Sequence, residues 1–90
     1  MPSILKDQIK KLPNEPGVYI FSDSAGRIIY VGKSIVIKKR VSSYFSGKNL
    51  GPKTEMLVNR IAKIDHISVF SEFEALLLES ELIKKHSPFF

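Results

Sequence analysis

Residues 16–33 have the sequence PGVYIFSDSAGRIIYVGK, and this stretch decides the fold because two short apolar runs flank a single turn. Each run carries a tyrosine beside a glycine, in Gly17–Tyr19 and in Tyr30–Gly32. Between them lies Asp23–Gly26, whose residue types are those that favour tight turns. An apolar run, a turn and a second apolar run predict a β-hairpin.

The register of this hairpin matters for function. We expect Phe21 to pair with Ile28, which puts Tyr19 directly opposite Tyr30 with both phenols on one face. A slip of one residue would separate them, because strand side chains alternate between faces. Two adjacent phenols followed by Lys33 indicate the start of a polar site; the alternative interpretation is a pair of core aromatics.

Elsewhere the chain predicts four helices and a third strand. The second helix has Ser34 as its expected cap, and Ser71 with Glu74 forms a capping box that starts the last helix. We expect the helices over Ile4–Lys11, Ile35–Phe45, Lys53–Ala62 and Glu72–Lys85, and the strand over Ile64–Phe70. The predicted order of elements is α-β-β-α-α-β-α.

Length and composition indicate one small domain, residues 1–90. No apolar run approaches the ~18 residues that a membrane span requires. We expect no secretion signal, because no basic segment followed by an apolar one opens the chain. The sequence has no cysteine, which excludes disulfides and cysteine-based zinc sites and fits a cytoplasmic location.

The net charge of +5, from 14 Lys and Arg against 9 Asp and Glu, favours a polyanionic partner such as nucleic acid. The alternative is a basic surface that serves only solubility. We take as candidates for phosphate contact Lys33, Lys38, Lys39, Arg40, Lys48 and Lys53. A solvated basic helix would explain the run Lys38–Arg40 equally well.

Lys33 and Arg40 are seven residues apart, a spacing that returns a helix to nearly the same direction. If the turn at Ser34 is tight, both cations overlook one face. Arg40 suits a scissile phosphate, because its planar guanidinium can bind two oxygens.

Glu79 falls on the apolar, inward face of the last predicted helix, near Ala75 and Leu82. An ionised carboxylate in such a position is costly unless it is paired or binds a metal ion. Alternatively, Glu79 forms an ion pair with Arg40 or Lys33, or lies exposed at the edge of the apolar stripe.

Several motifs in this order resemble the GIY-YIG endonuclease family, and most closely the branch formed by the N-terminal nuclease domains of bacterial UvrC proteins. The resemblance covers Leu12–Pro88 and is carried by Pro16–Phe21, Tyr30–Lys33, Lys39–Phe45 and Glu74–Glu79. It implies the GIY-YIG fold, which is of the α+β (α/β) class, with a small, mostly antiparallel three-stranded sheet flanked by helices.

The resemblance also implies a function, the hydrolysis of one phosphodiester of DNA. The family's catalytic residues map onto Tyr19, Tyr30, Lys33, Arg40 and Glu79, and Glu79 would hold a divalent metal, Mg²⁺ or Mn²⁺. Nearby cations favour a phenolate, so we predict Tyr19 or Tyr30 as general base. Both phenols must then face the same cleft as Glu79.

In the UvrC branch such a domain makes the 3′ incision of nucleotide excision repair after UvrA and UvrB have loaded. The expected partners are therefore DNA and UvrB. Three alternatives stay open, namely a stand-alone GIY-YIG nuclease with another role, a DNA-binding module on a degenerate nuclease fold, and a basic protein-interaction module.

The sequence departs from the family pattern at Ile35 and Val36, where relatives usually have Lys and Asn. A functional asparagine of the family would follow Phe90. The chain is accordingly expected to be either an excised domain or a naturally small protein.

Overall fold

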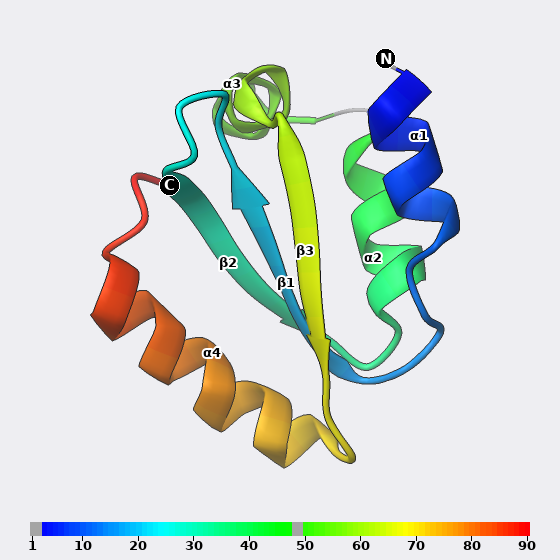
Figure 1. Ribbon diagram of the computed structural model, residues 1–90, viewed down its shortest axis with the longest axis vertical. Coiled ribbons are helices and arrows are strands. Elements are labelled where there is room, and N and C mark those ends of the chain that lie inside the picture. The colour runs from blue at the N-terminus through cyan, green and yellow to red at the C-terminus, as the bar shows by residue number, and fades with distance from the viewer. Residues whose placement is uncertain (1–2, 48–49) are drawn as a thin grey trace.

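A three-stranded sheet with helices on both faces forms the protein (Figure 1). The computed structural model describes residues 3–47 and 50–90. The elements are α1 (Ser3–Lys10), β1 (Gly17–Ser22), β2 (Ile28–Ser34), α2 (Ile37–Tyr44), α3 (Pro52–Arg60), β3 (Lys63–Ser68) and α4 (Glu72–His86). Their order confirms the predicted α-β-β-α-α-β-α sequence and fold class.

The strands lie in the order β2-β1-β3, and both neighbouring pairs are antiparallel. Every residue of the central strand β1 is buried, whereas β2 and β3 form the two edges. In Figure 1, α4 lies along one face of the sheet, while α1 and α2 lie on the other. Groups on the two faces can therefore approach one another only around an edge strand, β2 or β3.

The hairpin register differs from the expected one by two residues. Phe21 pairs with Tyr30, and Tyr19 pairs with Gly32, so Tyr19 does not lie directly opposite Tyr30. Because the difference is an even number of residues, every side chain keeps its predicted face. Tyr19 and Tyr30 are diagonal neighbours, with ring centroids 6.0 Å apart.

Two local irregularities produce this difference. The turn closes where the amide of Asp23 donates to the carbonyl of Arg27, with Gly26 at a φ of 83°. This closure moves the pairing by one residue from the expected one. A bulge between Phe21 and Ser22 moves it by one more.

Gly32 is required by the close approach of Tyr19, its partner across the strands. A Cβ atom at residue 32 would lie 2.3 Å from both Cζ and Oη of Tyr19. The tyrosine ring thus lies across the backbone where a side chain would otherwise be. This contact explains physically why a tyrosine on β1 accompanies a glycine on β2.

Two apolar clusters hold the layers together. The cluster beneath α1, α2 and α3 consists of Leu5, Leu12, Tyr19, Phe21, Ile29, Ile37, Val41, Tyr44, Leu57, Ile61 and Ile64. The smaller cluster, beneath α4, consists of Val18, Ile20 and Val31 with Leu78 and Leu82 packed against them. The Tyr19 side chain therefore packs on one face of the sheet, and the helix that carries Glu79 packs on the other.

The start of α2 was predicted wrongly. Ser34 is the last residue of β2 and caps no helix; its hydroxyl donates to the carbonyl of Val36 and accepts from the Val36 amide. Val36 is the N-terminal cap and makes no side-chain capping bond. The first amides of α2 instead donate to the carbonyls of Pro13 and Glu15, so the loop after α1 completes this helix end.

The predicted serine cap at the start of α4 is present, but the Glu74 carboxylate accepts from the Ser71 hydroxyl at 3.4 Å and not from the Ser71 amide as in a full capping box. The Ser71 hydroxyl accepts from the amide of Glu74 at 3.1 Å, and the helix ends at Ser87 in the left-handed conformation. This cap sets where α4 begins. In the described part of the chain, no helix is long and apolar enough to cross a membrane.

Candidate active site

Three tyrosines form a triangle on the α2 face of the sheet. Tyr19 comes from β1, Tyr30 from β2 and Tyr44 from the last turn of α2. Their ring centroids are 5.8 to 6.2 Å apart. The hydroxyls of Tyr19 and Tyr44 share a hydrogen bond of 3.0 Å. The three phenol groups thus act as one cluster rather than as separate side chains.

Arg40 covers this cluster from the solvent side. It lies one turn before Tyr44 on α2, and its guanidinium carbon is 5.4 Å from the centroid of the Tyr44 ring. A guanidinium over an aromatic face is attracted by the negative charge of the ring face. Since Arg40 stays exposed, it can contact an anion while its stem is held in place.

Burial raises the pKa of each phenol. The pKa of Tyr30 rises to about 12, by burial first and then through Tyr44. The pKa of Tyr44 also rises to about 12, by burial and then through Tyr19. Burial raises the pKa of Tyr19 as well, although Tyr44 and the Arg40 guanidinium act in the opposite direction. All three side chains are therefore neutral phenols at pH 7. The expectation from the sequence was the opposite, namely that nearby cations would lower a tyrosine pKa and favour the phenolate.

Glu79 reaches this site from the other face of the sheet. Its helix packs through Leu78 and Leu82 on the opposite face to the tyrosines, so the expectation of a single cleft on one face is wrong. Glu79 itself is half-buried, and its charge contributes to raising the pKa of Tyr30. Glu79 is therefore near enough to β2 for its charge to act on Tyr30, as the smallest of the contributions to that raised pKa.

Lys33 and Arg40 do not overlook one face in the expected way. Lys33 pairs with Val18, which places it on the α4 face, whereas Arg40 packs on Tyr44 on the other side. Lys33 shares its face with the helix that carries Glu79. The two cations flank the β2 edge from opposite sides.

The other candidate lysines have different surroundings. The Lys38 ammonium donates to the carbonyl of Lys10 at 3.1 Å and so ties α2 to α1. Lys39 is exposed in a shallow pocket beside Arg40. Lys53 lines a pocket together with Tyr30 and Tyr44. Lys48 lies outside the described residues.

The acidic residues around the site suit a metal that needs few protein ligands. Across residues 3–47 and 50–90, no group of three or more His, Asp or Glu side chains could hold a metal ion. Glu79 would be the single carboxylate ligand. Mg²⁺ commonly binds through one or two carboxylates and keeps several waters, so the donor set fits that ion.

A family model of the UvrC-like GIY-YIG domain matches residues 15–90 of this chain. The chain belongs to this family. Among its relatives, UvrABC system protein C of Desulfitobacterium hafniense is 52% identical over 85 residues, which cover 94% of this chain and 14% of that protein. The corresponding protein of Methanococcus maripaludis is 52% identical over 80 residues, covering 89% of this chain and 15% of the relative. The chain thus spans about one seventh of the length of these relatives.

Solved structures agree with the family assignment. The GIY-YIG N-terminal endonuclease domain of UvrC from Thermotoga maritima, bound to magnesium as its catalytic divalent cation, is 35% identical. It superposes with a TM-score of 0.86, and the match covers 99% of this chain and 97% of that one. The same domain was solved with tyrosine-to-phenylalanine and asparagine-to-alanine substitutions, each bound to a catalytic divalent cation.

Tyr44 is the member of the phenol cluster that was not singled out from the sequence as a candidate site residue. Its spacing from Val41 and Ile37 fits the apolar face of α2, and it is indeed buried there. The available signal was its position four residues after Arg40, which places the two side chains on neighbouring parts of one helix face.

Proposed function

We propose that this domain is a metal-dependent DNA endonuclease that hydrolyses one phosphodiester bond, with Tyr19, Tyr30, Lys33, Arg40 and Glu79 as its catalytic residues and Tyr44 beside them. One observation carries the proposal, the cluster of Tyr19, Tyr30 and Tyr44 with the exposed Arg40 guanidinium packed against it. The solved relatives, which are endonuclease domains with a bound catalytic cation, support it.

Arg40 is placed to bind the scissile phosphate. Its guanidinium is exposed on one side and held by the Tyr44 ring on the other. A fixed cation at this position stabilises the negative charge that develops on the phosphate in the transition state. Lys33, from the other side of the β2 edge, adds positive charge to the approach path of the DNA.

Tyr30 fits the role of general base better than Tyr19. Tyr19 is 1% exposed and its hydroxyl is bound to Tyr44, whereas Tyr30 is half-buried and lies near Glu79. Glu79 would hold the divalent cation, which supplies positive charge that cancels the effect of the carboxylate on Tyr30 and polarises a bound water. Tyr19 and Tyr44 then position the Tyr30 hydroxyl.

The bond changes balance simply. Tyr30 acts as the base in its phenolate form, so its phenol proton is first released to solvent. The water oxygen then forms a bond to phosphorus, and a proton of that water passes to the Tyr30 phenolate. The bond from phosphorus to one deoxyribose oxygen breaks, and that oxygen takes up a proton from solvent. Arg40 keeps the phosphate in line for the attack throughout.

At the level of the cell, we place the domain in UvrC-type excision repair in the cytoplasm, making the 3′ incision next to a lesion with UvrB as partner. The proteins in which this domain recurs are UvrABC system proteins C. The role predicts that nicking of a lesion-bearing duplex increases when UvrA and UvrB are added. Indifference to both proteins would favour a stand-alone nuclease instead.

A plasmid-nicking assay tests the chemistry. With Mg²⁺ or Mn²⁺ the parent domain should convert supercoiled plasmid to open circles, Arg40→Ala should slow this about 100-fold, and Glu79→Ala should abolish it. Glu81→Ala removes an exposed carboxylate of the same helix and should leave the rate unchanged. Equal nicking by Glu79→Ala and the parent would refute the metal-ligand assignment. DNA binding without nicking by the parent would favour the binding-module alternative.

A further inference from the structure

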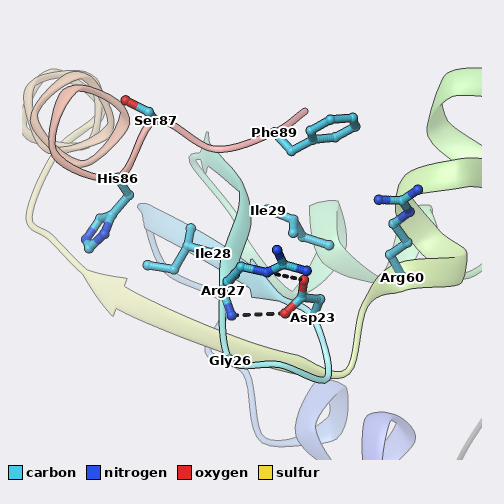
Figure 2. A pocket seen from close by; sticks show the side chains of 9 residues that line it. All are labelled: Asp23, Gly26, Arg27, Ile28, Ile29, Arg60, His86, Ser87 and Phe89. Atoms are coloured by element: carbon cyan, nitrogen blue, oxygen red, sulfur yellow. Dashed lines mark hydrogen bonds and ion pairs between the residues drawn. The ribbon is translucent and has the colours of Figure 1, made fainter.

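A second cavity lies at the turn end of β2, outside the tyrosine cluster. Figure 2 shows its lining, to which the hairpin turn, α3 and the end of α4 contribute. The cavity has a volume of about 660 Å³. Pockets of roughly 300–1,000 Å³ accommodate small organic ligands, so a nucleotide unit is an appropriate size.

Two cationic side chains, Arg27 and Arg60, line the cavity together with one acidic residue, Asp23. The Asp23 carboxylate is directed into the hairpin turn, where it accepts from the backbone amide of Arg27 at 2.9 Å and from its Nε at 3.2 Å. The Arg27 side chain remains 80% exposed, so most of its guanidinium faces outward. Such a lining attracts a phosphate group.

Arg60 and Phe89 add an aromatic platform. The Arg60 guanidinium lies 5.5 Å from the Phe89 ring centroid and 5.9 Å from that of Phe90. Phe89 is 72% exposed, so its ring is accessible to a ligand in the cavity. A nucleobase can stack on an exposed aromatic ring while the neighbouring arginine binds its phosphate.

This cavity lies beside the pocket of the proposed active site, although the two share no lining residue. Ile28 and Ile29 line it, and the next residue of β2 is Tyr30. On α3, Lys53 lines the tyrosine pocket and Arg60 lines this cavity; they share a helix face about 10 Å apart. Phe90 lies between them, because it lines the tyrosine pocket and also contacts Arg60.

We propose that this cavity, with Arg60 and Phe89 as its main contacts, binds one nucleotide of the substrate strand next to the cleaved phosphate. The phosphate lies against the Arg60 and Arg27 guanidiniums, and the base stacks on Phe89. The identity of the ligand rests on the proposed nuclease function. The recognition chemistry, an aromatic base joined to a phosphate, would also accept a free nucleotide, which the experiment distinguishes.

The test measures binding of a short, fluorescein-labelled oligothymidylate by anisotropy in EDTA, where no cleavage occurs. Arg60→Ala and Phe89→Ala should each weaken binding about tenfold, as expected for the loss of one stacked base or one phosphate contact. Lys84→Ala and Phe70→Ala remove the same kinds of side chain from exposed positions outside the cavity and should change affinity less than twofold. Thermal unfolding of each variant verifies that the fold is retained.

Equal weakening by the cavity variants and their controls would overturn the inference. So would thymidine monophosphate binding as tightly as the oligonucleotide, since the cavity would then serve a free nucleotide. The nicking assay is read separately. A parent that nicks while all four variants bind alike refutes the cavity alone, whereas selective weakening by the cavity variants in a parent that does not nick refutes only the nuclease function.

Discussion

Tyr19 and Gly32 share one cross-strand position, and each restricts what the other can be. We predict that Gly32→Ala destabilises the fold by about 1–3 kcal/mol, because the new Cβ would overlap the Tyr19 ring. The free energy of unfolding, from urea denaturation, measures this. Gly51→Ala is the matched control: nothing lies within 4 Å of its Cβ position, and the loss of a favourable cap residue costs at most about 1 kcal/mol. Equal costs at both sites would contradict the close-contact explanation.

Tyr44 is the residue whose role depends most on the structure. We predict that Tyr44→Phe keeps the fold, since the ring and its packing remain, but lowers the nicking rate about tenfold. The loss of the hydrogen bond to Tyr19, worth about 1 kcal/mol, would release the phenol cluster from its fixed arrangement. Single-turnover nicking gives the rate, and the melting temperature checks the fold. An unchanged rate would remove Tyr44 from the site.

At this scale the sequence revealed part of the candidate site. The sequence identifies as candidates the two hairpin tyrosines, Arg40 and Glu79. Each is either a polar group within an apolar pattern or part of a family motif. Tyr44 does not, because a tyrosine that packs in the core and also binds another phenol has the spacing of an ordinary core residue. Its second role is visible only from its partners.

At the scale of elements, helices and strands were predictable in type and order, since each has a clear hydrophobic period or cap. The pairing of the strands was less predictable than the elements themselves. The hairpin register depends on the αL glycine of the turn and on a bulge between Phe21 and Ser22, and neither follows from the apolar pattern. The start of α2 depends on carbonyls of Pro13 and Glu15, which are distant in sequence from Val36. Contacts of this kind are tertiary, so a local pattern does not contain them.

The cap of α4 makes a prediction of its own. Ser71→Ala should cost about 1 kcal/mol, because the amide of Glu74 loses its side-chain acceptor. Since this helix carries Glu79, fraying at its start should be visible as faster amide exchange in its first turn. Ser80→Ala, at an exposed interior position of the same helix, should be neutral or slightly stabilising. A similar loss of stability from both variants would argue against the cap.

For the whole molecule, the phenol cluster predicts a dependence of stability on high pH. The phenols of Tyr30 and Tyr44 have pKa values of about 12 in the folded protein against 10.0 ordinarily. Their stabilising contribution is complete below about pH 10 and is lost as the pH rises towards 12, since the unfolded chain releases these protons first. Urea denaturation at several pH values should show this loss. The loss should be shallower in a Tyr30→Phe, Tyr44→Phe double variant, and an identical profile would contradict the raised pKa values.

For the whole molecule, we propose that Glu79 holds the metal ion with which the tyrosine cluster and Arg40 act as a nuclease site. The most direct measurement is the single-turnover nicking rate of the parent and of Glu79→Gln across a range of Mg²⁺ concentrations. The parent rate should rise to a plateau, while Glu79→Gln, which keeps the shape of the side chain but loses its charge, should stay at least 100-fold slower at every concentration. A Glu79→Gln rate that reaches the parent plateau would contradict the account.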